Sequence, residues 1–383
     1  MRKSAVTVFL CALVLLSLAC GPRSSDLKVA DFPKIDPAAV MRHIEVLASD
    51  EYEGRFPGTK GEELSVAYMI EQLKLLGLAP GNADGTYIQT VPLAGIAVQG
   101  SPTLIFKHGA ARQDLQWKDD HVSWTKRFVE SIDLKDSEMV FCGYGVQAPE
   151  FGGDDFKGID LKGKTMVVLI GDPPVPDPAD PAALDPKVFG GRAMTYYGRW
   201  SYKYEMAAKM GAAGALIVHE TEPAAYPFSV VQIKTTEQFD IAAPDQNMGR
   251  AAVEGWITLD QAKTMFAAAG MDFDALKKAA LSRDFKPVPL GTTASISFKN
   301  ALRTIDSRNV IAELEGSDPL LKDEFVIYTA HWDHFGIGPE VDGDRIYNGA
   351  MDNASGVGGV IEIARALAKV KPAPKRSVLF LFV

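Results

Sequence analysis

The C-terminal part of the chain alternates between strand-like and helix-like hydrophobic patterns. Residues 325–328 form an unbroken apolar run, which predicts a buried strand. Residues 357–368 carry apolar side chains at helical spacing, and residues 377–383 form a second apolar run. A strand, a helix and a strand joined by short loops form the right-handed crossover unit of a mixed sheet sandwiched by helices. This part of the sequence therefore predicts an α/β fold.

Two amphipathic helices are predicted near the start of the same domain. Asp36 followed by Pro37 is typical of an N-cap and a first helical position. A second helix is predicted over about residues 62–76, and Gly77 is a typical C-terminal stop. The predicted apolar stripe of the first helix consists of Val40, Met41, Ile44 and Leu47.

The middle of the chain has a different pattern. Between residues 96 and 290, short β-like runs alternate with loops rich in Gly, Pro and Asp, and only residues 201–218 are typical of a helix followed by a strand. We therefore predict a smaller, mainly β domain at residues 96–290, inserted into an α/β domain formed by residues 36–95 and 291–383. Beyond the insert, residues 294–298 and 307–314 are predicted as two separate strands.

Residues 1–20 are typical of a targeting signal. Two basic residues precede an apolar run at residues 6–19, which is too short for a stable spanning helix but suits the core of a signal peptide. Cys20 and its neighbours are similar to the end of a bacterial lipobox, although Ser17 stands where leucine is usual. The sequence predicts an exported protein, either a periplasmic or cell-envelope lipoprotein anchored to the membrane through Cys20, with residues 21–35 as a tether, or a secreted protein.

Composition and charge limit the classes of binding partner that are expected. The chain of 383 residues has 40 basic and 49 acidic residues, a net charge of −9, and no long lysine or arginine block, which argues against nucleic acid as a partner. Of the three cysteines, only Cys142 lies outside the predicted signal, so no internal disulfide is expected. Cys142 is interpreted as a small buried hydrophobic residue rather than a nucleophile. Nothing in the sequence indicates an oligomeric state.

Candidate chemistry follows the strand predicted at residues 325–328. His331 and Asp333 are alternate residues of an extended segment, so their side chains point the same way, at the strand end where α/β sheets bind ligands. A histidine beside a carboxylate serves either as a metal ligand or as an oriented general base. Asp352 precedes a predicted helix, where it is either a further ligand or an N-cap, with Asn353 and Ser355 as rivals for the cap. A zinc site needs three or four protein ligands, so spacing alone leaves these roles open.

Residues 330–333 and 348–356 resemble the metal-site motifs of the co-catalytic zinc exopeptidases, the family of bacterial leucyl aminopeptidase, aminopeptidase Y and glutamate carboxypeptidase II. Residues 54–61 and 307–310 match the same family in the same order. Residues 140–218 resemble the protease-associated domain that many members carry as an insertion. The resemblance implies the zinc-exopeptidase fold with a protease-associated-like insert.

The resemblance also implies a site with two Zn²⁺ ions. His331 would bind one zinc, Asp352 would bridge both, and Asp333 would orient His331. The implied activity is that of an aminopeptidase, which removes N-terminal residues from peptide substrates by a two-metal hydroxide mechanism. In the family, the following segment supplies a glutamate pair that includes the general base, and this chain ends at Val383. We therefore expect the chain to be the N-terminal part of an enzyme and to be inactive, or nearly so, by itself.

Three alternatives stay open. A carboxypeptidase or dipeptidase differs only in which substrate end is recognised, and a single-zinc glutaminyl cyclase shares the core fold. A non-catalytic relative would keep the fold as a binding surface, although such relatives lose the ligands that are present here. His334, where many relatives have a small polar residue, is interpreted as a loop histidine with ordinary hydrogen bonds, with a place in the substrate pocket as the alternative.

Overall fold

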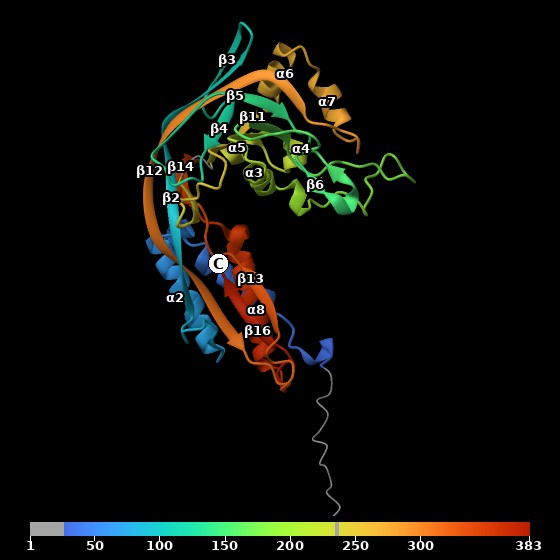
Figure 1. Ribbon diagram of the computed structural model, residues 1–383. Helices are drawn as coiled ribbons and strands as arrows, with labels where there is room; N and C mark the ends of the chain where they lie inside the picture. The colour runs from blue at the N-terminus through green and yellow to red at the C-terminus, as the bar shows by residue number, and fades with distance from the viewer. Residues whose placement is uncertain (1–26, 234–236) are drawn as a thin grey trace, which may run out of the picture. The chain divides into compact units, whose positions relative to one another are not determined.

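The computed structural model describes residues 27–233 and 237–383, which divide into two units (Figure 1). Unit 1 consists of the residues up to Thr90 together with Arg308–Val383, and unit 2 consists of Val91–Ser307. The predicted signal peptide and Cys20 lie outside the described residues. Within those residues, no helix has both the length and the apolar character needed to cross a membrane.

Two long strands explain why these units differ in their limits from the predicted insert at residues 96–290. Strand β2 spans Ile88–His108 and strand β12 spans Val288–Leu314, so each continues from one unit into the other. The prediction of separate strands at residues 294–298 and 307–314 is wrong, because both are parts of β12. Pairing partners hold the polar segment between them extended, which local hydrophobicity does not reveal.

The sheet of unit 1 is mixed, as predicted. Its strands follow the order β1 (Ala79–Pro80), β12, β16 (Ser377–Phe382) and β13 (Phe325–Ala330). Strands β13 and β16 are parallel, whereas β16 pairs with β12, and β12 with β1, in the antiparallel sense. The predicted α/β fold class with a mixed sheet is confirmed.

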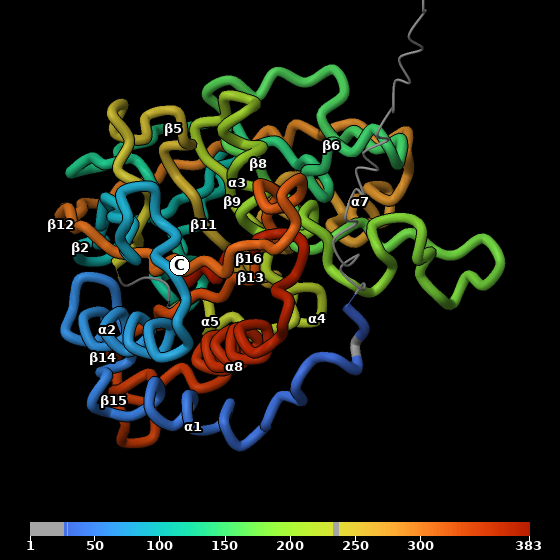
Figure 2. Tube along the Cα trace, turned by 90° about the horizontal axis from the view of Figure 1, so that it is seen from below, coloured from blue at the N-terminus to red at the C-terminus, as the bar shows by residue number. Residues whose placement is uncertain are grey.

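Helices of unit 1 pack on this sheet and on one another. Helix α8 contacts β13 and β16, and α1 packs against α8 (Figure 2). The buried stripe of α8 agrees with the predicted helical spacing, and each fully buried aliphatic side chain contributes roughly 1.5–3 kcal/mol. Its large apolar members are Val357, Val360, Ile361 and Leu367. The other elements of unit 1 are α1 (Pro37–Leu47), η2 (Asp50–Arg55), α2 (Lys60–Leu75), the hairpin β14 (Gly336–Val341) and β15 (Asp344–Tyr347), η5 (Ala350–Ala354) and α8 (Ser355–Lys369).

Helix α1 begins as predicted, and the structure confirms only part of its predicted apolar stripe. The Asp36 carboxylate accepts a hydrogen bond from the backbone N–H of Ala38 at 3.0 Å, which confirms the cap. Of the predicted stripe, Leu47 is fully buried and Ile44 packs against the core, whereas Met41 is 50% exposed. His43, which lies outside the stripe, is buried. His43 is within hydrogen-bond distance of the Tyr68 hydroxyl at 2.6 Å and of the Glu362 carboxylate at 3.2 Å. Polar partners from two other helices therefore place a histidine inside, which the hydrophobic pattern could not indicate.

Strand β13 is not the buried strand that its apolar run predicts. It pairs only with β16 in the described sheet, so it is an edge strand. Its side chains at residues 325–328 are between 36% and 55% exposed. Only Ala330, the last residue before the candidate site, is buried. The prediction failed because burial depends on the neighbours of the strand and not on its own composition.

Unit 2 is built on a sheet with parallel strands at its centre. The sheet order is β10, β2, β12, β5, β8, β9, β11 and β4, and the neighbours from β5 to β11 are parallel. Strands β8 and β9 are buried along their whole length, which is typical of parallel strands covered on both faces. Bounds of the strands are β3 (Ala111–Leu115), β4 (His121–Trp124), β5 (Ser131–Phe141), β8 (Thr165–Leu169), β9 (Gly214–His219), β10 (Gln238–Ile241) and β11 (Val253–Thr258).

Helices complete unit 2, which is therefore less purely β than predicted. Helix α3, Trp200–Lys209, leads into β9, which confirms the helix and strand predicted within residues 201–218. Cys142 is buried, as interpreted from the sequence. The remaining elements are β6 (Gln147–Ala148), β7 (Gly153–Asp154), α4 (Thr221–Ala224), α5 (Phe228–Ile233), α6 (Leu259–Ala268) and α7 (Phe273–Ala279). The resemblance of residues 140–218 to a protease-associated domain stays a prediction.

Candidate functional site

His331 and Asp333 lie side by side just after β13, as their alternation predicts. The His331 Nδ1 atom is 3.1 Å from Oδ1 of Asp333 and 3.2 Å from the Asp333 carbonyl oxygen. The hydrogen bond to this carboxylate raises the pKa of His331. Both side chains are a little over two-fifths exposed, so the pair is oriented and still accessible.

Asp352 reaches the same place from a distant part of the sequence. It lies in η5, between β15 and α8, and its Oδ1 atom is 3.0 Å from Nε2 of His331. The structure thus brings together all three residues that the sequence selected: His331, Asp333 and Asp352.

The capping role that competed for Asp352 belongs to its neighbour. The Asn353 side-chain oxygen accepts a hydrogen bond from the backbone N–H of Gly356 at 3.0 Å, at the start of α8. The Asp352 side chain is 67% exposed, and its contact in the described structure is with His331. Its carboxylate is therefore available as a ligand.

These residues fit part of a zinc site. Two ligands of one tetrahedral zinc, each about 2.0–2.1 Å from the ion, are about 3.3 Å apart, and the His331 and Asp352 donor atoms are 3.0 Å apart. Asp333 occupies the other ring nitrogen of His331, where metal sites place an orienting carboxylate. Among residues 27–233 and 237–383, no group of three or more His, Cys, Asp and Glu side chains is arranged to hold a metal. The described residues therefore supply a partial donor set.

Arg55, which was not predicted to be a site residue, connects the two loops of the site. Its side chain is fully buried, at the end of η2. The guanidinium donates to the carbonyl oxygens of Trp332 at 2.8 Å, Asn348 at 2.6 Å and Gly349 at 2.8 Å, and also to that of Leu47. One planar group thus fixes the backbone between His331 and Asp333 and the backbone just before Asp352.

Burial and charge act in opposite directions on Arg55. Burial lowers its pKa, while the carboxylates of Asp333 and Asp352 raise it. Arginine stays protonated in proteins, so the guanidinium keeps all its donors. The only sequence signal for this residue was its place beside Gly54 in the family-like segment at residues 54–61.

Gly349 is required by this arrangement. Its φ is +62°, and a Cβ atom there would lie 2.5 Å from the Asp352 carbonyl oxygen and 2.5 Å from Cδ2 of His334. The same atom would lie 2.6 Å from Nη2 of Arg55. Only glycine permits both the left-handed backbone and this close approach.

His334 lies next to the site without extending its donor set. Its backbone N–H donates to the Arg55 carbonyl oxygen at 3.3 Å, and its ring packs on Phe335 with 4.6 Å between centroids. Burial lowers the pKa of the ring. These contacts agree with the interpretation as a loop histidine.

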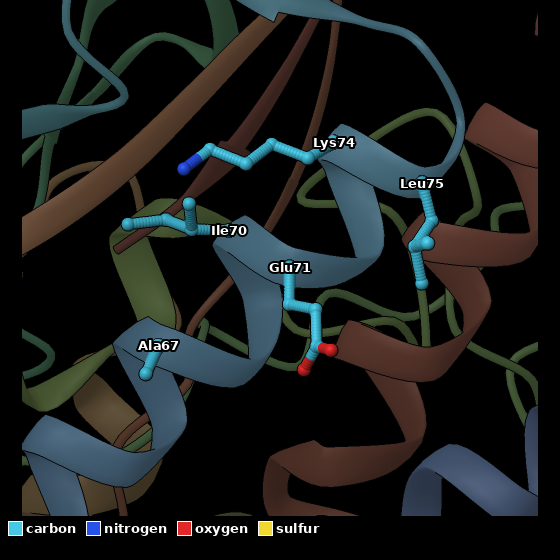
Figure 3. Close-up of a pocket in the computed structure, with 5 residues that line it drawn as sticks. All are labelled: Ala67, Ile70, Glu71, Lys74 and Leu75. Carbon is cyan, nitrogen blue, oxygen red and sulfur yellow. The ribbon is translucent and has the colours of Figure 1, made fainter.

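A separate pocket of unit 1 lies along α2 and holds none of the selected residues (Figure 3). Its volume is about 480 Å³, and Lys74 extends from it so that its ammonium lies 5.6 Å from the centre of the Tyr87 ring. All of its lining comes from one helix: Ala67, Ile70, Glu71, Lys74 and Leu75. It offers no paired catalytic groups, so His331 and its neighbours remain the candidate site.

Comparison with known families identifies the C-terminal segment. Residues 309–383 match the sequence profile of Peptidase family M28. His331, Asp333 and Asp352 lie within the matched residues, and the resemblance to zinc exopeptidases is confirmed. No curated protein matches the chain.

Several solved structures resemble the chain at low identity. The aminopeptidase from Aneurinibacillus sp. strain AM-1 is 19% identical, with 91% of this chain and 62% of that chain covered and a TM-score of 0.44. The zinc aminopeptidase BSAP from Bacillus subtilis is 16% identical, with 91% and 61% covered and a TM-score of 0.36. A Peptidase M28 precursor from Shewanella amazonensis SB2B is 16% identical, with 90% and 66% covered and a TM-score of 0.39. The chain spans about three fifths of the length of the two aminopeptidases.

Proposed function

We propose, from the match of residues 309–383 to Peptidase family M28, that this protein is a zinc-dependent exopeptidase of the aminopeptidase type. The observation that carries the proposal is the 3.0 Å contact between His331 and Asp352, with Asp333 on the far ring nitrogen of His331. This is the arrangement of a metal ligand pair with an orienting carboxylate.

Each residue of the site has a separate task in this proposal. Nε2 of His331 and the carboxylate of Asp352 would hold zinc, and the largely exposed side chain of Asp352 makes it the candidate bridge to a second ion. Asp333 would accept a hydrogen bond from Nδ1–H of His331, which leaves Nε2 free to bind and makes it more basic. When bound, zinc lowers the pKa of water and polarises a carbonyl group. Arg55 would keep the two ligand-bearing loops at a fixed separation.

Substrate class and location are proposed from the sequence resemblance. Peptides with a free amino end are the proposed substrates, and a carboxypeptidase or dipeptidase is the main alternative. Export and a lipid anchor on Cys20 are proposed from the targeting signal. Loss of lipid labelling in a Cys20→Ser variant tests the anchor without involving the site.

The test of function uses the full-length protein with zinc. We expect binding of zinc and hydrolysis of amino-acid anilides that have a free amine, and we expect Asp352→Ala to weaken zinc binding by more than about 100-fold and to abolish hydrolysis. The matched control is Asp323→Ala, which removes an exposed carboxylate of unit 1 away from the site. Zinc binding and hydrolysis should be unchanged in this variant.

Other outcomes separate the alternatives. Full zinc content and activity in Asp352→Ala would overturn the ligand assignment. Zinc binding without hydrolysis of any peptide would favour a binding relative. Cleavage only of peptides with a free carboxyl end would indicate a carboxypeptidase, and cyclisation of an N-terminal glutamine a glutaminyl cyclase.

A further inference from the structure

Unit 2 contains a cavity of about 610 Å³ that the proposed reaction does not use. Its lining comes from the segments that follow three neighbouring parallel strands: Tyr144 after β5, Asp172 after β8 and Glu220 after β9. The carboxyl ends of parallel strands are where α/β sheets bind ligands. The volume lies in the range of about 300–1,000 Å³ that is typical of small-molecule sites.

A buried lysine gives the cavity a fixed frame. Lys203 of α3 is fully buried, and its ammonium donates to the carbonyl oxygens of Tyr144 at 2.6 Å, Gly171 at 3.1 Å and Tyr197 at 2.7 Å. Two of these three residues, Tyr144 and Gly171, line the cavity. The backbone of the cavity wall is therefore held before any ligand arrives, which lowers the entropic cost of binding.

The loop of residues 172–195, which supplies part of the cavity wall, is also held by hydrogen bonds. Both carboxylate oxygens of Asp172 are 2.7 Å from Thr195, one accepting from its backbone N–H and the other from its hydroxyl. Each oxygen of Asp172 therefore already accepts one hydrogen bond within the protein. Residues between these two positions, including Leu184 and Met194, supply apolar wall.

The Tyr144 hydroxyl is a hydrogen-bond donor in the wall of the cavity. The residue is only 3% exposed, it lines the cavity, and its hydroxyl has no hydrogen-bond partner in the part of the chain that the structure describes. The hydroxyl oxygen is not among the fully buried polar atoms that lack a partner, so it is accessible and can donate to a ligand. Burial raises the pKa of this phenol, so it is a proton donor at neutral pH. An acceptor on a ligand would satisfy it.

The charged residues of the wall are Asp172, Arg192, Glu220, Glu222 and Lys277, and two of them, Glu220 and Lys277, form an ion pair. The Lys277 ammonium is 2.5 Å from Oε2 of Glu220, and their side chains are 31% and 15% exposed. Among the described residues this contact occupies one carboxylate oxygen of Glu220 and one N–H of Lys277. The remaining oxygen and two N–H groups offer a negative and a positive partner next to each other.

We propose that this cavity binds a free α-amino acid or a short zwitterionic peptide. The ligand ammonium would lie on Glu220, its carboxylate would accept from Lys277 and from the Tyr144 hydroxyl, and its side chain would contact the apolar wall. A ligand that carries both charges offers partners to Glu220, Lys277 and the Tyr144 hydroxyl at once. The site lies wholly in unit 2 and does not depend on the proposed peptidase activity.

Calorimetric titration tests this site separately from the reaction. The Asp352→Ala protein in chelator is titrated with L-leucine and with Ala-Ala, so that neither hydrolysis nor the candidate zinc site contributes. We expect saturable binding to a single site, and we expect N-acetyl-leucine and leucinamide, which each lack one charge, to bind at least about tenfold more weakly. Absence of binding, or equal binding of the blocked analogues, would overturn the proposal.

Variants locate the binding. Tyr144→Phe removes only the hydroxyl and should weaken binding of L-leucine by about five- to thirtyfold, and Lys277→Met should weaken it by at least as much. The matched control is Lys263→Met, which breaks the exposed pair with Asp274, 3.0 Å apart and away from the cavity, and should leave binding unchanged. Unchanged binding in both cavity variants, or equal weakening in Lys263→Met, would show that the ligand binds elsewhere.

Discussion

Two fully buried cations, Arg55 in unit 1 and Lys203 in unit 2, hold loops by donating to backbone carbonyl oxygens rather than to carboxylates. Arg55 contacts four carbonyl oxygens, and Lys203 contacts three. In both cases the loops follow strand ends and carry the polar side chains of a candidate site. The comparison shows one physical solution used twice, since a buried charge must find several hydrogen-bond partners.

The difference lies in the geometry of the two cations. A guanidinium is a planar group with five donors, and in Arg55 it reaches carbonyl oxygens of both loops of the candidate site. An ammonium is a compact charge with three donors, and in Lys203 they converge on one cluster of carbonyl oxygens. We therefore expect each unit to depend on the size and shape of its own cation.

The largest effect is expected on removing each cation. Arg55→Met and Lys203→Met should each lower the free energy of unfolding by about 3–5 kcal/mol, because buried carbonyl oxygens lose their donors. Arg55→Lys should recover only part of the loss, whereas Lys203→Arg should fail to fit the compact cluster. Urea unfolding gives the magnitudes.

Hydrogen exchange shows where each loss acts. Arg55→Met should speed exchange in residues 331–354, and Lys203→Met should speed it in residues 144–146 and 171–198. If exchange rises equally in both units for either variant, Arg55 and Lys203 do not hold their loops independently of each other.

The next largest effect tests how closely the neighbouring atoms approach the backbone of Gly349 in unit 1. Gly349→Ala should cost about 2–5 kcal/mol, the sum of about 1–2 kcal/mol for a left-handed residue and about 1–3 kcal/mol for overpacking against Arg55 and Asp352. Gly343→Ala is the matched control, because Gly343 also has a positive φ, +88°, and a Cβ atom added there would have no other atom within 4 Å.

Both variants are measured by urea unfolding and by zinc binding. Gly343→Ala should show only the backbone cost and normal zinc affinity. If Gly349→Ala is no more destabilised than Gly343→Ala, the contact around Arg55 is not as tight as described.

The smallest expected effect is a pH dependence of the unfolding free energy that arises from a buried carboxyl group of unit 2. Glu254 of unit 2 is 2% exposed, and its Oε2 atom accepts from Nε1 of Trp124 at 3.3 Å, while Oε1 has no partner among the described residues. Burial raises its pKa to about 7, against the lowering effect of Lys126 and Arg250, and Asp240 raises it further. Unlike Arg55 and Lys203, this group has no full set of hydrogen bonds.

The sign follows from the proton that the folded state retains. Between the ordinary pKa of about 4.5 and the raised value of about 7, folded Glu254 holds a proton that the unfolded chain has released. Its stabilisation is complete below pH 4.5 and is lost as pH rises through 7. Glu254→Gln should therefore reduce the decline in unfolding free energy between pH 5 and 8 by about 1–3 kcal/mol.

Urea unfolding at pH 5 and 8 measures this difference. The matched control is Glu138→Gln, whose side chain is 69% exposed on the same sheet. The unfolding free energy of this control should decline between pH 5 and 8 by as much as that of the parent protein. A decline that is the same in Glu254→Gln and in the parent would contradict the assignment.

Short-range features of the molecule followed from the sequence. The cap at Asp36, the apolar stripe of α8 and the shared orientation of His331 and Asp333 each depend on residues within a few positions of one another. Such features are set by the periods of helix and strand, which the sequence carries directly. The family motifs added Asp352 as a ligand, and the structure placed it on His331.

Features that depend on residues far apart in the chain did not follow from the sequence. The exposure of β13, the continuity of β12 and the burial of His43 all depend on what lies beside each element. No local pattern encodes the neighbour, so these predictions failed even where the element itself was right.

The sequence by itself determined which side chains could do chemistry: a histidine and an aspartate on one side of a strand end, and a second aspartate before a helix. Only the tertiary structure decided that Asp352 contacts His331 and that Arg55 fixes both loops. Arg55 and Trp332 are 277 residues apart, and hydrogen bonds over such a separation exist only once the chain has folded around them.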